Sequence, residues 1–437
     1  MSQLNISRRK ALKMALFGPG CVGLQSLATG IPISALLNGI PINAHAQNAG
    51  TPQNLILISR SAGDPFNANA PGSYVDGVVN NPDPSMAPTN FYLGSQETTA
   101  AAPWASLPEW ALSQRTFIHH RTYQNVHGQH DNVMRLLGNA LGSAGTGTEN
   151  VASLYSSETS SLLGTIQQEP IALGGNALTF EGRALQSVSP QTLATLFSPE
   201  SGTALQLTQL RQQRLDEINA VLRSNGTSAQ REWLDRYATS REQIQALDES
   251  LLETFSSITS DDQDAQIAAA VALIQMQVSP VIQIAIEFGG DNHVDGGLAN
   301  EAAQYVTGVQ AISSLLTQLE TAGLQDRVTV ANLSVFGRTL AQKGTRGRNH
   351  NLNHHVMMIS GANVNPGVVG SIAASGNDFG ATGIDSVTGA GSDDADIPAD
   401  ETLEGATKTL GAALGISNEQ MDLRINGGKV IQAALSS

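Results

Sequence analysis

Short apolar runs alternate along the chain with longer stretches of helical periodicity. Five runs are suited to buried or half-buried strands, and each meets a turn rich in glycine or polar residues: 54–59, 115–123, 282–288, 328–336 and 356–359. Apolar residues at helical spacing lie between them, in the ranges 127–141, 207–222, 227–251, 262–277 and 305–319. Strands separated by helices predict an α/β fold with a mostly parallel, doubly wound sheet covered on both faces.

Three segments lack this alternation. Residues 66–104 and 361–400 are rich in glycine, asparagine and other small or polar residues, which predicts little regular structure. The range 197–278 contains several segments of helical periodicity, which predicts a helical insertion into a single α/β domain that spans 47–437.

The first 46 residues have the pattern of a twin-arginine signal peptide. Arg8 and Arg9 precede a weakly apolar stretch that glycine and proline interrupt, and Ala44-His45-Ala46 provides a cleavage site. The stretch is too broken for a stable spanning helix, which needs roughly 20 apolar residues. We therefore expect the twin-arginine machinery to export a mature chain that begins at Gln47 and is periplasmic or secreted, without stable membrane insertion. An uncleaved basic amphipathic start is the alternative.

The net charge and the cysteine content argue against several classes of function. The chain has 437 residues and a formal charge of −15, and without its first 46 residues it has 19 basic and 38 acidic residues, or −19. Such a surface repels phosphate backbones and anionic lipids, which argues against binding to nucleic acid or a membrane surface. The one cysteine, Cys21, lies in the signal segment, so the mature chain can form no intramolecular disulfide.

The histidines gather where the expected strands end. Apart from His45, there are eight, and they fall into three groups: 119–130, 293 and 350–355. Asp64 and Asp291 also follow strands, and Asp291 shares a face of an extended segment with His293. Because parallel strands end at one edge of a sheet, these side chains could meet there. Imidazole and carboxylate ligands suit a divalent zinc, manganese or iron ion. The alternative is that they are hydrogen-bonded sheet and loop residues.

A basic cluster directly precedes His350. Four of the basic residues fall within eleven positions: Arg338, Lys343, Arg346 and Arg348. On an acidic protein they could hold a small anionic substrate or ligand, with Arg338 and Arg348 as the candidate residues. An exposed, solvated loop is the competing interpretation.

Several motifs together resemble the exported domain-of-unknown-function family 1501. These are the segments 288–293 (FGGDNH) and 336–339 (FGRT), and the range 349–370, which begins NHNLNHH. The family is grouped with the alkaline phosphatase and sulfatase clan, so the resemblance implies that fold. The clan's order of metal ligands along the chain implies that the ligands here are Asp64, Asp291, His293, Asn349, His350, and His354 or His355.

Two departures from the clan pattern bear on activity. Val126-His127 stands where the family often has Ser-His, which places His127 near the site but leaves no obvious hydroxyl nucleophile. Asn349 replaces an aspartate, and a neutral amide binds a divalent cation more weakly than a carboxylate does. The resemblance therefore implies a metal-dependent hydrolase of phosphate or sulfate esters, with a single-metal or degenerate site. The alternative is a non-catalytic periplasmic binding or assembly protein on the same fold.

Overall fold

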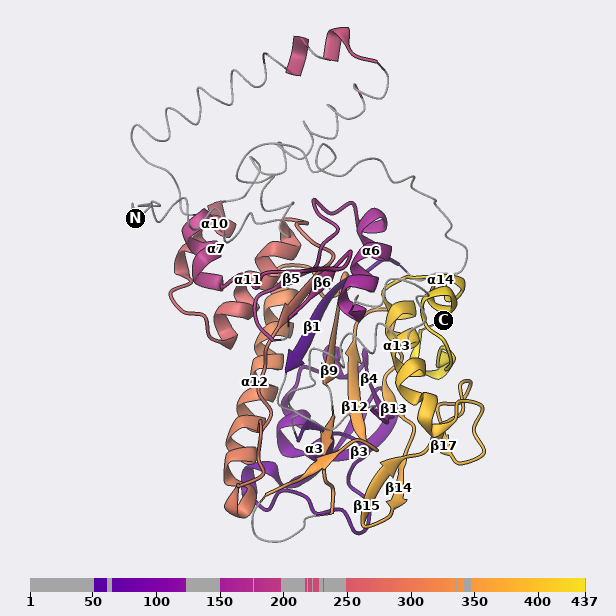
Figure 1. Ribbon diagram of the computed structural model, residues 1–437. Helices are drawn as coiled ribbons and strands as arrows, with labels where there is room; N and C mark the ends of the chain where they lie inside the picture. The colour runs from indigo at the N-terminus through magenta and orange to yellow at the C-terminus, as the bar shows by residue number, and fades with distance from the viewer. Residues whose placement is uncertain are drawn as a thin grey trace, which may run out of the picture.

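A mixed sheet forms the centre of the chain (Figure 1). The computed structural model describes residues 51–60, 65–122, 150–175, 177–197, 249–334, 336–341 and 347–436, with scattered residues between 217 and 231. Within these ranges, seven strands pair in the order β13-β4-β12-β9-β1-β8-β5. Their bounds are β1 (Asn54–Arg60), β4 (Arg115–His120), β5 (Ile171–Ala172), β8 (Val281–Ile284), β9 (Val328–Ser334), β12 (His355–Ser360) and β13 (Gly367–Val369).

All but one of these strands run in the same direction. β1 is parallel to β8 and β9, while β12 is antiparallel to both of its neighbours, β4 and β9. The mostly parallel sheet is thus confirmed, and the reversed β12 is an addition that the sequence did not predict. As a result, the start of β12 lies at the same edge as the carboxyl ends of the parallel strands, with His355 opposite His120.

Helices cover the two faces of the sheet. α11 (Gln263–Gln275) and α12 (Ala299–Thr321) pack on one face, and α6 (Val151–Leu163) and α13 (Thr402–Ala413) on the other (Figure 1). Alternate residues of β1 point to opposite faces, so Ile56 joins the first core and Leu57 the second. A strand buried on both sides needs apolar residues at every position, which is why β1 is a continuous apolar run.

The remaining described α-helices and strands are short. They are α3 (Phe66–Asn69), α4 (Glu109–Leu112), α7 (Pro190–Phe197), α10 (Glu249–Ser257) and α14 (Asn418–Arg424), and the two-stranded pairs β2–β3 (Pro88–Leu93, Gln96–Ala101), β6–β7 (Thr179–Phe180, Arg183–Ala184), β10–β11 (Gly337–Arg338, His350–Asn351), β14–β15 (Ile372–Ser375, Asp378–Ala381) and β16–β17 (Gly383–Ile384, Gly391–Ser392).

The prediction of little regular structure in 66–104 and 361–400 was wrong. The first range contains the β2–β3 pair, and the second contains β13 and two further pairs, β14–β15 and β16–β17. β3 has the sequence QETTAA and is exposed over its first two residues. Polar, partly exposed strands of this kind carry no clear apolar pattern for the sequence to reveal.

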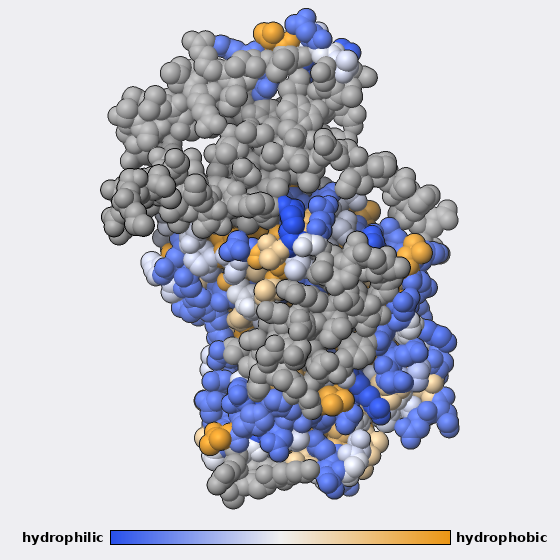
Figure 2. Space-filling model, in the orientation of Figure 1, coloured by the Kyte–Doolittle hydropathy of each residue, from blue (hydrophilic) through white to orange (hydrophobic). Residues whose placement is uncertain are grey.

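Several sequence-based expectations fall outside the described residues. These are the signal segment, the helix at 127–141, and most of the helical insertion at 197–278. The last part of that insertion, α11, packs directly on the sheet. No described helix is long and apolar enough to cross a membrane. In the view of Figure 2, apolar side chains on the described surface appear as separate spots among hydrophilic ones.

Arg115, at the start of β4, is a buried charge without a counterion. Its side chain is fully buried and its three guanidinium nitrogens have no hydrogen-bond partner; the ring of Trp104 lies 5.9 Å away. Burial lowers the pKa of Arg115 to about 9.

We expect Arg115→Met to raise the free energy of unfolding by about 1–4 kcal/mol, because methionine keeps the apolar contacts without a desolvated charge. Urea denaturation checks this, with the exposed Arg327→Met as control; a loss of stability only in Arg115→Met would contradict it.

Candidate metal centre

Two loops bring a carboxylate and two imidazoles together. The loop that follows β8 carries Asp291 and His293, and β11 carries His350. β11 pairs with β10 so that His350 lies opposite Arg338. Both segments extend from the edge of the sheet at which the parallel strands end, as the sequence predicted for ligand-bearing loops.

The three side chains are close enough to share one ion. His293 Nε2 lies 2.7 Å from His350 Nε2 and 3.6 Å from Asp291 Oδ1. One ligand atom from each residue lies within 4.8 Å of the others. The side chains of His293 and Asp291 are 38% and 50% exposed, so an ion can reach them from solvent. Two imidazole nitrogens and a carboxylate oxygen form a donor set that zinc, manganese and iron accept. These residues therefore fit a divalent metal.

Arg338 places a positive charge beside these ligands. Its fully buried guanidinium donates to Asp291 Oδ1 at 3.1 Å and to His293 Nε2 at 3.3 Å. It also lies 5.5 Å from the ring centre of Phe336, whose ring is 4.3 Å from that of His350. That Arg338 binds an anion stays a prediction, since its guanidinium is 0% exposed and is already paired with Asp291.

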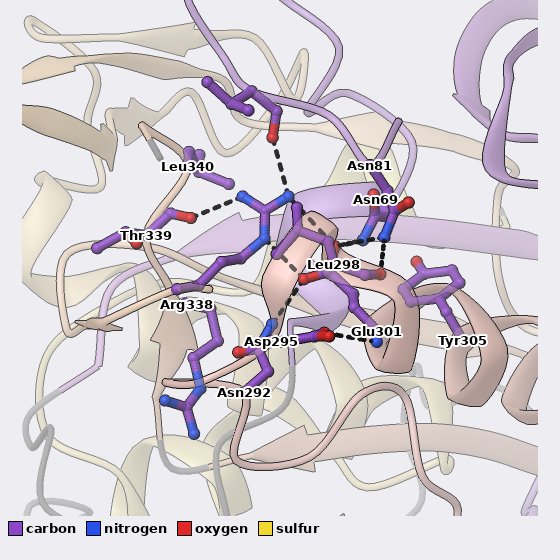
Figure 3. A network of polar contacts seen from close by, with 12 residues as sticks. Asn69, Asn81, Asn292, Asp295, Leu298, Glu301, Tyr305, Arg338, Thr339 and Leu340 are labelled. Atoms are coloured by element: carbon purple, nitrogen blue, oxygen red, sulfur yellow. Dashed lines mark hydrogen bonds and ion pairs between the residues drawn. The ribbon is translucent and has the colours of Figure 1, made fainter. Parts of the chain in front are cut away.

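A buried ion pair between Arg348 and Glu301 lies behind the cluster. Arg348 Nε is 2.8 Å from Glu301 Oε2, and both side chains are fully buried. Its other nitrogens donate to Glu301 Oε1 and to the carbonyls of Thr339 and Val79. Glu301 in turn accepts from the amides of three asparagines (Figure 3): Asn69, Asn81 and Asn292.

The expectation that Arg348 binds an external anion was therefore wrong. Four hydrogen bonds to protein oxygens bind its guanidinium in the interior, and a protein carboxylate already provides its anion. Burying a guanidinium is costly unless it is paired in this way.

The same ion pair connects the two ligand-bearing loops. Asn292, between Asp291 and His293 in the chain, donates to Glu301 at 2.7 Å and accepts the backbone N–H of Arg348 at 3.1 Å. Gly347 has φ +107°, and a Cβ there would lie 2.0 Å from the Asn292 carbonyl oxygen. Only glycine permits so close an approach. The distance between His293 and His350 is thus set by contacts beneath them.

The structure does not bring His354 and His355 into this group. Both are fully buried. His354 contacts His119 and Asn67, and the ring of His355 lies 5.5 Å from that of His120. His355 also lines a small cavity together with Asn332, Ser334 and apolar residues. Asn349 has an exposed side chain, while Asp64 and His127 lie outside the described residues.

Hydrogen bonds assign the protons of two buried histidines. The backbone N–H of Arg338 donates to Asn67 Oδ1, which leaves Asn67 Nδ2 as the donor to His354 Nδ1. His354 must then donate from Nε2 to His119 Nδ1, and His119 from Nε2 to the Pro71 carbonyl. Each hydrogen bond in this series requires that both imidazoles be neutral. Burial accordingly lowers the pKa of His119 to about 4 and that of His354 well below its usual value.

Sequence reasoning missed the residues that support the cluster. Asn67 binds both backbone polar groups of Arg338, and Asp378 accepts from Asn351, the neighbour of His350. Glu301 belongs to the first turn of a long helix, where an acidic residue is unremarkable. Only its burial, which the sequence does not show, distinguishes it.

Comparison with known proteins identifies a family. No curated protein matches the chain. Three similar solved structures are those of Ps i-CgsB (TM-score 0.37, 11% identity, covering 87% of this chain and 76% of that chain), Ps i-CgsB in complex with k-i-k-neocarrahexaose (0.37, 10%, 88% and 76%) and the lipoteichoic acid synthase LtaP from Listeria monocytogenes (0.33, 9%, 91% and 80%). A family model described as "Protein of unknown function (DUF1501)" matches residues 151–384, more than half of the chain. The chain therefore belongs to the DUF1501 family, as its motifs predicted.

Proposed function

We propose that Asp291, His293 and His350 bind one divalent metal ion and that the chain hydrolyses phosphate or sulfate esters there. The observation that supports this most directly is the meeting of the three ligand atoms within 4.8 Å beside the guanidinium of Arg338. We further propose that the fold is of the alkaline phosphatase and sulfatase type and that the chain acts after twin-arginine export.

Each part of the centre has a role in this proposal. The metal, when bound, would supply a Lewis acid and lower the pKa of water. Asp291 and His293 would hold it from one loop and His350 from the other. Arg338 would stabilise, through its positive charge, the negative charge that develops on an ester oxygen beside the metal. The buried ion pair of Arg348 and Glu301 would keep the two loops at a fixed spacing.

A non-catalytic binding protein is the second candidate. Asn349 is exposed next to His350, and among the residues grouped in this centre Asp291 is the one carboxylate. A centre with so little negative charge favours weak metal binding and could bind an anionic ligand without converting it.

Metal content and ester hydrolysis distinguish these functions. We expect the purified chain, after incubation with Zn²⁺ in sulfate buffer, to contain about one equivalent of metal by mass spectrometry and to hydrolyse aryl phosphate or sulfate esters. His293→Ala should remove the metal and lower hydrolysis more than about 100-fold, since it deletes a direct ligand. Val294→Ala, which changes an exposed neighbour, should retain its metal. Metal without hydrolysis of any ester would favour the binding protein, and a wild-type chain that takes up no metal after incubation with Zn²⁺ and sulfate would refute the metal-dependent hydrolase.

A further inference from the structure

Arg338 presents a permanent positive charge to two of the three proposed metal ligands. It donates to Asp291 at 3.1 Å and to His293 at 3.3 Å, and its own side chain is fully buried. A guanidinium does not lose its proton in proteins. The charge therefore remains in place when a cation arrives.

Arg338 is also fixed in position. Its backbone N–H donates to Asn67 Oδ1 and its carbonyl accepts from Asn67 Nδ2, both at 2.9 Å. β10–β11 pairing places it opposite His350, and the Phe336 ring lies beside its guanidinium. Since its backbone and its charged end are both held, moving the guanidinium away from the ligands would break several contacts in a buried region.

A fixed guanidinium has opposite effects on the two charged species that the proposed function requires. It repels a metal ion at the neighbouring ligand atoms. It also partly neutralises the negative charge of Asp291, which would otherwise attract that ion. It attracts an oxyanion that binds beside the metal, because opposite charges attract across a region of low dielectric constant. An oxyanion next to the metal would offset both positive charges at once.

We propose that this centre takes up a divalent metal ion and a tetrahedral, doubly charged oxyanion cooperatively, and that Arg338 couples the two. This inference rests on the proposed metal site. It adds that the affinity for the metal is weak when the metal binds alone and stronger when the anion is present. Thermodynamic linkage makes the effect reciprocal, so the metal strengthens anion binding by the same factor.

Calorimetry on the full chain tests the coupling. Zn²⁺ is titrated in chloride and then in sulfate at equal ionic strength, with free Zn²⁺ set by a competing indicator. We expect Zn²⁺ to bind at least about 10-fold more tightly in sulfate, which corresponds to about 1.4 kcal/mol of coupling. Arg338→Met should reduce the sulfate effect to less than about 2-fold without weakening Zn²⁺ binding in chloride. Arg327→Met, an exposed arginine at the opposite edge of the sheet, should behave as wild type.

The outcomes separate this inference from the proposed function. A wild-type chain that binds no Zn²⁺ in either salt refutes the metal centre itself. Equal Zn²⁺ affinity in chloride and sulfate refutes the coupling and leaves the metal centre intact. An undiminished sulfate effect in folded Arg338→Met excludes Arg338 as its cause. If circular dichroism shows that this variant does not fold, Arg338→Gln takes its place, because it keeps a hydrogen-bonding side chain and removes the charge; an undiminished sulfate effect in folded Arg338→Gln overturns the proposal.

Discussion

Arg348→Met is expected to destabilise the protein by about 3–5 kcal/mol, because it leaves the Glu301 carboxylate buried without its cation. The free energy of unfolding from urea denaturation measures this loss. Metal affinity should fall as well, since Arg348 binds Asn292 through its backbone and Glu301 through its side chain, and these contacts set the spacing between His293 and His350.

The double variant Glu301→Gln, Arg348→Met is the control. It removes both charges and keeps an amide that can accept from the surrounding asparagines, so it should recover much of the lost stability. It should not restore metal affinity, because the bidentate connection between the loops is still missing. If Arg348→Met were as stable as wild type, the buried ion pair could not be what holds the two loops together.

Acidification is expected to destabilise the protein between about pH 6.5 and 4, a range above that in which most carboxylates titrate. Burial lowers the pKa of His119 and that of His120 to about 4 from 6.5. Within this window the unfolded chain binds protons that the folded chain excludes, so the free energy of unfolding decreases as the pH falls. Each of the two histidines should cost about 3 kcal/mol over the whole window.

Urea denaturation at a series of pH values measures this effect. His120→Phe should make the dependence on pH shallower, because it removes a group that is neutral in the folded state and protonated in the unfolded state. His293→Gln, which changes a partly exposed histidine, serves as the comparison. Constant stability from pH 7 to pH 5 in the wild type would show that the buried imidazoles titrate alike in both states.

The central strands could be predicted because burial on both faces leaves a strong pattern. β1 and β9 were found as apolar runs, and α12 was found from its periodicity together with Gly323, which has φ +66° just beyond its end. β14 and β15 were missed because they are partly exposed and rich in small and polar residues. The two strands are neighbours in sequence and pair with each other, but neither has alternating apolar residues that would reveal a strand.

The sequence could predict those site residues whose positions follow from where the strands end. Asp291, His293 and His350 follow or adjoin elements that end at one edge, and the structure brings them together. His354 directly precedes the reversed β12 and His355 is its first residue, so neighbouring strands and side chains already enclose both. For Arg348, the sequence showed a charged residue in a basic loop. Its partner Glu301 is 47 positions earlier, and nothing local links the two.

The reversal of β12 has a consequence for engineering this protein. β9 ends, and β12 begins, at one edge of the sheet, so the chain leaves the sheet after Ser334 and re-enters it at His355 on the same edge. This connection carries Arg338, Arg348 and His350 together. We expect that this connection can be exchanged between homologous chains as one segment, provided that residues 288–301, which contact it, are exchanged with it. The strands of the central sheet would keep their pairing.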